Sequence, residues 1–310
     1  RVLIYSIAME QKANGEMLRT VGTYEPKVGG DVALTIDIGL QRKASEVLGQ
    51  RKGAVVISNI NGEILALVSG PGFDPGRVED FVTGEDKPLF NRALGGLYPP
   101  GSVFKIVTAA AGLEEGRIYE DTKIEDTGEI RVGEFRYGNW YFDQYGKTEG
   151  QVDIVKGLQR SNDIFFYKVA EKVGAEKLAQ WADKFGLGQV VDLGLGGEAA
   201  GVVPSPEWKD RVKGERWFLG NTYHMGIGQG DFQLTPLQVH RMAAIIATAG
   251  KKCKLSVIGD QLSDCQDIGL DSETIELIKE GMVAACSPGG TAFPFFDWSL
   301  NSPSTNSGRV

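Results

Sequence analysis

A serine and a lysine stand three residues apart in YPPGSVFK, residues 98–105, directly before an apolar run typical of a helix. Positions i and i+3 share one face of a helix, so Lys105 could accept the proton of the Ser102 hydroxyl group. That transfer needs a lysine whose pKa is lowered by burial or by a neighbouring charge. The positive end of the helix dipole would favour the serine alkoxide. The pair therefore predicts acyl transfer without histidine, which suits a chain with only two histidines.

Two other interpretations of the same stretch compete with this one. An ordinary helix start fits, because proline suits the approach to a helix and serine is a good cap. A phosphate-binding loop does not fit, because it needs several glycines and a lysine directly before the serine or threonine. Here Gly101 stands alone and the lysine follows the serine. Catalysis and capping both stay open from these residues alone.

A second polar group precedes another apolar helix pattern, in RSNDIFFYKVAEKVG, residues 160–174. Asp163 would make a good N-cap, so capping explains this group as well as catalysis does. In the catalytic interpretation Ser161 relays a proton between Lys105 and the leaving group. Asp163 then holds Lys105 or the substrate by a hydrogen bond.

Composition narrows the class of protein. The chain has 310 residues, 42% hydrophobic and 24% charged, with a net charge of -8, so no general attraction to nucleic acid is expected. The cysteines Cys253, Cys265 and Cys286 lie far apart without a CxxC pair, which predicts free or buried thiols and neither a disulfide framework nor a zinc site. No apolar run is long enough for a membrane span, and no signal peptide is visible.

The elements that must position the polar residues follow from periodicity and turn signals. Residues 32–37 alternate like a strand, residues 39–49 have helical spacing, and two β-rich runs flank Asn61-Gly62, a strong hairpin signal. Strands at the front of the chain and helices behind them favour an α+β fold. The remaining expectations are two helices over 153–185, mostly loop over 186–222, a helix over 235–250 closed by Gly250, and a helix over 271–286 capped by Asp271 or Ser272.

The two polar motifs resemble the Ser-x-x-Lys and Ser-x-Asn/Asp motifs of penicillin-binding transpeptidases and serine β-lactamases. Longer blocks over roughly residues 31–298 resemble class B penicillin-binding proteins in the same order: PLFNRALGGLYPPGSVFK, SNDIFFYKVAEKVG, GVVPSPEWK, GNTYHMGIGQGDFQLTPLQ and PGGTAFPFF. YPPGS, the aspartate of SND and HMGIGQG are more similar to elongation-type than to division-type enzymes. The resemblance implies a serine β-lactamase/D,D-transpeptidase-like fold, with an antiparallel sheet, flanking helices and a mostly helical subdomain.

The resemblance also implies roles for six residues and a reaction. The reaction would be cross-linking of peptidoglycan stem peptides that end in D-Ala-D-Ala, with β-lactams as mimics of the substrate and with no metal or cofactor. The enzyme would sit in the bacterial cell membrane, catalytic domain outward, beside a membrane glycosyltransferase, with its anchor outside this sequence. The residues are Ser102 as nucleophile, Lys105 as base, Ser161 and Asp163 as the second motif, and Thr222 and Gln229 as substrate-binding residues.

One departure from the family keeps two rivals open. The family completes its site with Lys-Thr/Ser-Gly, yet no lysine follows Gly290-Thr291-Ala292, and Asn306-Ser307-Gly308 stands near the expected place. We therefore expect a chain shortened or altered at its end, with residues 287–310 poorly ordered and acylation slow. A non-catalytic β-lactam-sensing or scaffold module stays possible. A β-lactamase-like hydrolase would need a glutamate that activates water after the second motif, and no such loop stands out.

The expected division of the chain follows from the same blocks. Residues 1–30 are short, glycine-containing polar pieces without a sustained period, which indicates the tail of a preceding domain and a linker. Residues 31–310 would form the transpeptidase domain.

Overall fold

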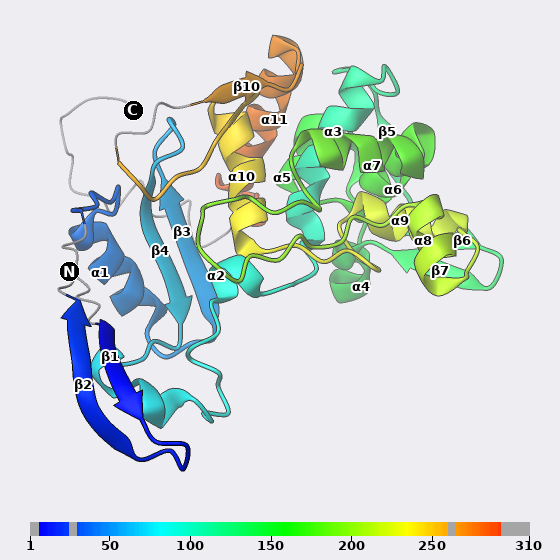
Figure 1. The fold of residues 1–310 in the computed structure, drawn as a ribbon. Coiled ribbons are helices and arrows are strands. Elements are labelled where there is room, and N and C mark those ends of the chain that lie inside the picture. The colour runs from blue at the N-terminus through cyan, green and yellow to red at the C-terminus, as the bar shows by residue number, and fades with distance from the viewer. Residues whose placement is uncertain (1–5, 25–29, 260–263, 293–310) are drawn as a thin grey trace, which may run out of the picture.

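The computed structural model describes residues 6–24, 30–259 and 264–292. Within these ranges a part built on the β-hairpin of residues 53–70 stands beside a larger helical part. Helix α10, residues 236–247, lies where the two parts meet (Figure 1). The strands are β1 Ser6–Gln11, β2 Met17–Tyr24, β3 Gly53–Ser58, β4 Ile64–Gly70, β5 Ile124–Asp126, β6 Glu129–Val132, β7 Phe135–Gly138, β8 Gly150–Val152, β9 Lys251–Cys253 and β10 Cys265–Asp267.

The helices alternate with these strands along the chain. The α-helices are α1 Ile38–Leu48, α2 Arg92–Gly95, α3 Lys105–Glu114, α4 Trp140–Tyr145, α5 Ile154–Gln159, α6 Asp163–Val173, α7 Ala175–Lys184, α8 Pro206–Lys213, α9 Leu219–Gly226, α10 Pro236–Ala247 and α11 Ser272–Ala285. Two 3-10 helices are η1 Pro75–Phe81 and η2 Gly101–Phe104. Among the described residues the named strands pair two by two, always antiparallel. The α+β class is therefore confirmed.

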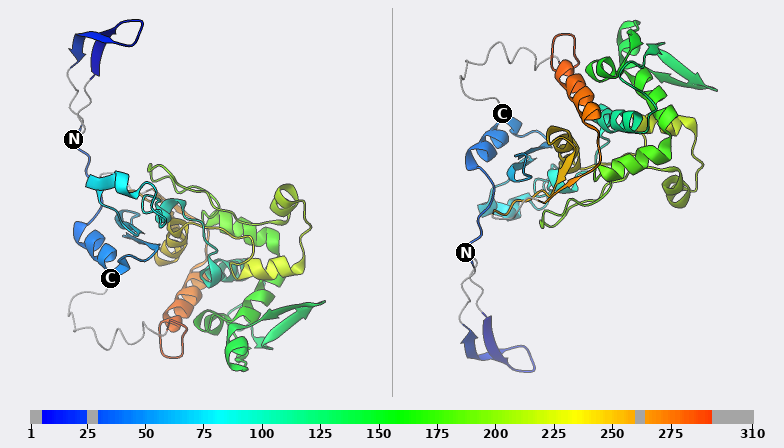
Figure 2. Two further views of the ribbon diagram at one scale, coloured as in Figure 1. Left: turned by 90° about the horizontal axis from the view of Figure 1, so that it is seen from below. Right: turned by 90° about the horizontal axis from the view of Figure 1, so that it is seen from above.

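The predicted hairpin about Asn61-Gly62 is confirmed. Gly62 has a φ of 88°, which a glycine adopts without steric cost, and β3 pairs with β4 on either side of the turn. Buried and half-buried residues alternate along β4, as expected of a strand with two unlike faces. The views in Figures 1 and 2 place α1 on one side of the hairpin and α10 on the other. This part has its own small core, which includes Ile64, Leu94, Leu237 and Val257.

The strand expected over residues 32–37 is wrong. This segment makes only an isolated bridge, from Leu34 to Ile258, and its backbone bonds are divided between two neighbours. Thr35 N–H donates to Val257 O and Asp37 N–H donates to Leu65 O, so no continuous ladder forms. Asp37 then caps α1, where its side chain accepts a hydrogen bond from Leu40 N–H. The cap ends the extended run before a strand can develop.

The helical part surrounds α3, which is buried on nearly every side. Residues 105–112 of α3 are all buried, and α6, α7 and α11 contact it. A helix covered all round lies inside the core and not at its surface. The apolar helix pattern predicted within residues 160–174 is confirmed, since Phe165, Phe166 and Val169 are buried in the main core. Because α3 begins at Lys105, the helix carries this side chain into the interior.

Helix boundaries in the middle of the chain differ from the prediction. Residues 153–185 form three helices, α5, α6 and α7, because the turn of residues 160–162 and Gly174 interrupt the helical pattern. The stretch expected to be mostly loop, residues 186–222, contains α8 and the first half of α9. The N-cap of α6 is Asn162 and not Asp163, and its side chain accepts from Phe165 N–H at 2.9 Å. The helices over residues 235–250 and 271–286 are confirmed as α10 and α11, the second with Asp271 as its N-cap residue.

The expectation that the cysteines are free or buried thiols is wrong for two of them. Cys253 and Cys265 form a disulfide bond, while Cys286 is free and exposed. The two bonded cysteines face each other across the antiparallel pair β9–β10. Strand pairing brought together two thiols that are twelve positions apart, which spacing alone did not indicate. Such bonds persist mainly outside the cytosol.

Three other expectations concern residues 1–30, a membrane-spanning helix and the order of residues 287–310. β1 and β2 form a hairpin that stands apart from the rest of the protein in both views of Figure 2. No helix in the described ranges is long and apolar enough to cross a membrane. The poor order expected for residues 287–310 is wrong for 287–292, where Thr291 N–H donates to Gln159 O and Ala292 N–H to Ala285 O. Residues 293–310, including Asn306-Ser307-Gly308, lie outside the described residues.

Candidate active site

A cleft of about 1000 Å³ brings together polar residues from distant parts of the chain. Ser102 comes from η2, Ser161 from the turn before α6, Asp163 from the first position of α6, and Gln229 from the loop after α9. These are four of the six site residues that the sequence predicts. The remaining lining residues are Trp140, Tyr141, Tyr145, Lys147, Arg160, Gly290 and Thr291.

Ser102 is exposed on the short 3-10 turn that leads into α3. A 3-10 helix has three residues per turn, so side chains at i and i+3 lie one above the other. Ser102 and Lys105 occupy two such positions, Ser102 exposed and Lys105 buried. Phe104 anchors the turn from within, because it is fully buried and its ring lies 4.5 Å, centroid to centroid, from that of Phe232.

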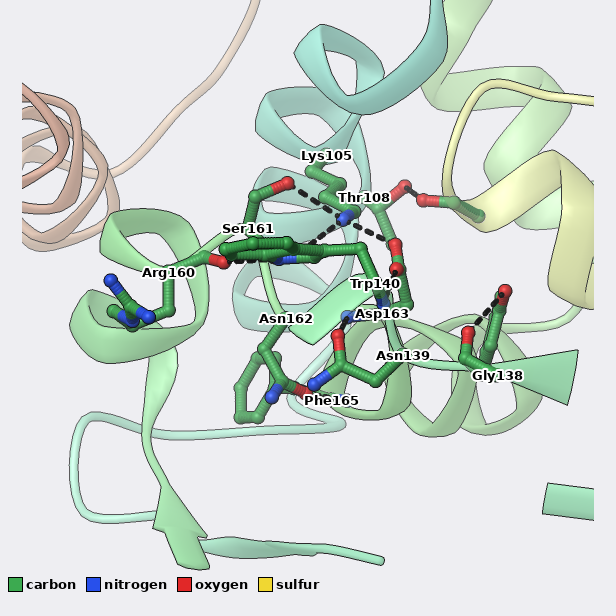
Figure 3. Close-up of polar contacts among 12 residues, drawn as sticks. Lys105, Thr108, Gly138, Asn139, Trp140, Arg160, Ser161, Asn162, Asp163 and Phe165 are labelled. Atoms are coloured by element: carbon green, nitrogen blue, oxygen red, sulfur yellow. Dashed lines mark hydrogen bonds and ion pairs between the residues drawn. The ribbon is translucent and has the colours of Figure 1, made fainter. Parts of the chain in front are cut away.

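Lys105 lies directly beneath the cleft, with only 1% of its surface exposed. Its Nζ donates to Ser161 O at 2.7 Å, to Ser161 Oγ at 3.0 Å and to Asp163 Oδ1 at 2.7 Å (Figure 3). Burial lowers the pKa of Lys105 below the ordinary lysine value, and the charge of Asp163 opposes part of that effect. Burial is thus the influence that favours the neutral amine that a lysine base requires, and the Asp163 carboxylate holds the amine in place while it favours the charged form.

The turn that holds Ser161 and Asp163 has an unusual backbone. Ser161 has a φ of 49°, in the left-handed region that few residues other than glycine adopt. With this conformation both its carbonyl oxygen and its hydroxyl group face Lys105 Nζ. Asp163 is fixed from the other side, because its Oδ2 accepts from Trp140 N–H at 3.1 Å. The second motif thus encloses the amine of Lys105 with three acceptor atoms.

The GIGQG block, residues 226–230, packs against the turn that carries Ser102. Gly101 N–H donates to Gly228 O at 2.8 Å. Nearby, Tyr98 and Leu234 join the same two segments by two backbone hydrogen bonds, one donated by each residue. This contact places Gln229 in the wall of the cleft. Thr222 is not in that wall: it is buried in α9, where its Oγ1 accepts from Trp217 Nε1 at 2.8 Å.

Gly228 leaves no space for a side chain at this contact. It has a φ of 68°, and a Cβ atom would lie 2.3 Å from Gly101 O. We expect Gly228→Ala to displace the Ser102 turn and to slow acylation by a β-lactam about tenfold or more, as misplaced catalytic groups do. A time course with a fluorescent penicillin would measure this.

Gly194→Ala is the matched control for Gly228→Ala. Gly194 has a φ of 72° but no atom within 4 Å of its added Cβ, so it shares the backbone strain without the clash. That strain costs about 1–3 kcal/mol. Equal acylation rates in the two variants would show that the contact with Gly101 does not position Ser102.

The sequence did not identify an aromatic and cationic wall of the cleft. The Arg160 guanidinium group lies 5.7 Å from the centre of the Trp140 ring and 5.2 Å from that of Tyr141, and Arg160 pairs with Glu149 at 2.8 Å. Trp140 Nε1 donates to Arg160 O at 2.9 Å, which fixes the indole ring. The signal was the aromatic cluster RYGNWYFDQYG, to which no role could be given from spacing alone.

No group of three or more histidine, cysteine or acidic side chains in the described part of the chain could hold a metal ion.

Comparison with known proteins places the chain in a family. Residues 52–298 match the penicillin binding protein transpeptidase domain. The peptidoglycan D,D-transpeptidase MrdA of Acinetobacter baumannii is 39% identical over 259 residues, which are 78% of this chain and 37% of that protein. MrdA of Escherichia coli K12 is 31% identical over 312 residues, which are 93% of this chain and 49% of that protein. The chain thus spans half or less of the length of these curated relatives.

Solved structures agree in fold. The crystal structure of Pseudomonas aeruginosa PBP2 in complex with WCK 5153 matches with a TM-score of 0.81 and 34% identity, over 88% of this chain and 63% of that one. PBP2 from Helicobacter pylori, in complex with MreC, matches with a TM-score of 0.79 and 28% identity, over 94% of this chain and 56% of that one. The chain belongs to the penicillin-binding protein transpeptidase family, among its class B, elongation-type members.

Proposed function

We propose that this chain is the catalytic domain of a peptidoglycan D,D-transpeptidase that works through an acyl-enzyme on Ser102. One observation carries the proposal: a fully buried lysine amine lies between the second-motif residues Ser161 and Asp163, beneath the cleft that exposes Ser102. Burial lowers the pKa of this lysine and so favours the neutral amine, which can accept a proton.

The reaction would follow from this geometry in two halves. Ser102 Oγ attacks the carbonyl carbon of the penultimate D-alanine, and its proton passes to Lys105. The C–N bond breaks, and Ser161 relays the proton from Lys105 to the departing D-alanine amine. An amine of a second stem peptide then attacks the acyl-enzyme, gives up a proton to Lys105, and releases Ser102, which regains a proton. The Ser102 N–H group would be one oxyanion donor.

Asp163 would orient Lys105 and not transfer the proton itself. Its two carboxylate oxygens are occupied by Lys105 Nζ and by Trp140 N–H. Asp163 is also the only carboxylate among the described residues that line the cleft. A hydrolase of the β-lactamase type needs a free base that activates a water molecule, and these contacts leave Asp163 unsuited to that task. The cleft therefore favours a transpeptidase over a β-lactamase.

The lifetime of the penicilloyl-enzyme tests this proposal. We expect a stable adduct that persists for hours, because the only carboxylate among the described lining residues, Asp163, is already held by Lys105 and Trp140 and is not free to activate water. Intact-protein mass spectrometry at intervals after removal of free penicillin would follow its loss. Turnover in less than a second would favour the β-lactamase-like hydrolase, and no adduct at all would favour the non-catalytic module.

The cellular setting is also proposed. Disulfides are rare in cytosolic proteins, so the Cys253–Cys265 bond supports a position on the outer side of the bacterial cell membrane. The PBP2 of Helicobacter pylori was solved with MreC, which supports a place in a complex with other proteins. We propose that this is a wall-synthesis complex and that a membrane glycosyltransferase belongs to it. We propose residues 31–310 as the transpeptidase domain and 1–30 as the tail of a preceding domain with its linker.

A further inference from the structure

Asp126, far from the motifs in sequence, lies at the centre of a buried polar network. It ends β5, and only 2% of its surface is exposed. Its carboxylate accepts four hydrogen bonds, each of 2.9 Å: Oδ1 from Gly128 N–H, and Oδ2 from Asn139 Nδ2, Glu149 N–H and Asn162 Nδ2. A carboxylate is the side chain that can accept so many bonds without donating one.

Two fully buried amides connect this carboxylate to the second motif. Asn139 and Asn162 are both 0% exposed, and each uses its amide nitrogen on Asp126. Their oxygens face the start of α6. Asn139 Oδ1 accepts from Asp163 N–H at 3.2 Å, and Asn162 Oδ1 accepts from Phe165 N–H at 2.9 Å. Figure 3 shows Asn139 and Asn162 beneath the turn that carries Ser161 and Asp163.

The same network also holds Asp163 Oδ2, the carboxylate oxygen that does not accept from Lys105. Asn139 immediately precedes Trp140, whose N–H donates to Asp163 Oδ2. Holding Asn139 therefore fixes both the backbone and the carboxylate of Asp163. Asn162 is also the residue next to Ser161, whose left-handed backbone costs about 1 kcal/mol or more and needs such support. Two of the segments that meet at this carboxylate, those of Asn139 and Asn162, therefore lead to the acceptors around Lys105.

We propose that Asp126 is a positioning residue for acylation, which sets the second motif against Lys105 without touching the substrate. This inference rests on the proposed function. Its chemical reason is the match of one acceptor group to four donors. An amide of the same size would turn an NH₂ group toward donors and break the network on one side, because buried polar groups without partners are costly.

Asp126→Asn tests the proposal with almost no change in volume. We expect the acylation rate constant at saturating penicillin to fall roughly ten- to a hundredfold, as for a misplacement of about 1 Å. The dissociation constant of the non-covalent penicillin complex should stay nearly unchanged, because Asp126 does not line the cleft. Hydrogen exchange of the Asp163 and Trp140 amides should become faster. If Asp126→Asn fails to fold, Asn139→Ala takes its place, because it leaves Asp126 three of its donors. This variant should also slow acylation.

Gln238→Met is the matched control for lost buried hydrogen bonds. Gln238 is also 0% exposed and holds three bonds, to Gln189 O, to Ala200 O and from Thr235 N–H, away from the second motif. It should lower the melting temperature but leave the acylation rate constant unchanged. Acylation at the wild-type rate in both Asp126→Asn and Asn139→Ala would overturn the positioning role. A wild-type protein that forms no adduct would instead overturn the proposed function.

Discussion

Replacing Ser102 by alanine is expected to abolish covalent labelling by penicillin. The acyl bond forms on a hydroxyl oxygen, and Ser102 supplies an exposed one on the cleft above a buried lysine. Loss of the nucleophile removes the acyl-enzyme route entirely, so the expected change is complete and not a reduction in rate. Labelling with a fluorescent penicillin, followed on a denaturing gel, measures it directly.

Ser272→Ala is a suitable control for this variant. Ser272 is the first residue of α11, on a helix whose residues do not line the cleft. The control should be labelled at the wild-type rate. Labelling that persists in Ser102→Ala would show that another residue is the nucleophile, and Ser161 in the same cleft would be the first candidate.

Replacing Lys105 has the second largest expected effect. Lys105→Met keeps most of the buried volume and removes the base, so acylation should fall by at least the roughly hundredfold typical of general-base loss. The change also leaves Asp163 without its ion-pair partner, and breaking a buried pair on one side costs about 3–5 kcal/mol. The double variant Lys105→Met with Asp163→Asn removes that unpaired charge and should therefore recover the lost stability. Rapid acylation of either folded variant would contradict the assignment of the base.

The pH dependence of acylation is an independent test of Lys105 as the base. Acylation needs neutral Lys105, so its rate should rise as pH rises through the pKa of this group. Because burial lowers that pKa, the rise should occur below the ordinary lysine value of 10.5. Asp163 raises the pKa, so Asp163→Asn should move the rise to lower pH. In Lys105→Met the rise should be absent.

Part of the fold could be predicted because local signals and tertiary contacts agree. The turn at Asn61-Gly62 needs a positive φ that glycine provides, and this dipeptide was enough to predict the hairpin of β3 and β4. The Ser102–Lys105 spacing places both residues on one side of any helical turn, whether α or 3-10. The segment of residues 32–37 shows the opposite case, since its strand-like alternation was overridden when Asp37 became a helix cap.

Other features depend on contacts between residues remote in sequence. The Cys253–Cys265 bond depends on the pairing of β9 with β10. The role of Asp126 depends on two amides that meet it only in the folded chain. Thr222 and Gln229 stand in one block, seven positions apart, yet α9 buries the first and the following glycine turn exposes the second to the cleft. Sequence spacing carries no information about such separations.

The most direct test is the location of the adduct on the wild-type protein. After reaction with penicillin, digestion with trypsin and tandem mass spectrometry identify the modified residue. We predict a single penicilloyl group on Ser102, in the peptide that begins at Ala93 and ends at Lys105. An adduct on any other residue, or none on Ser102 while the protein is folded, would contradict the account.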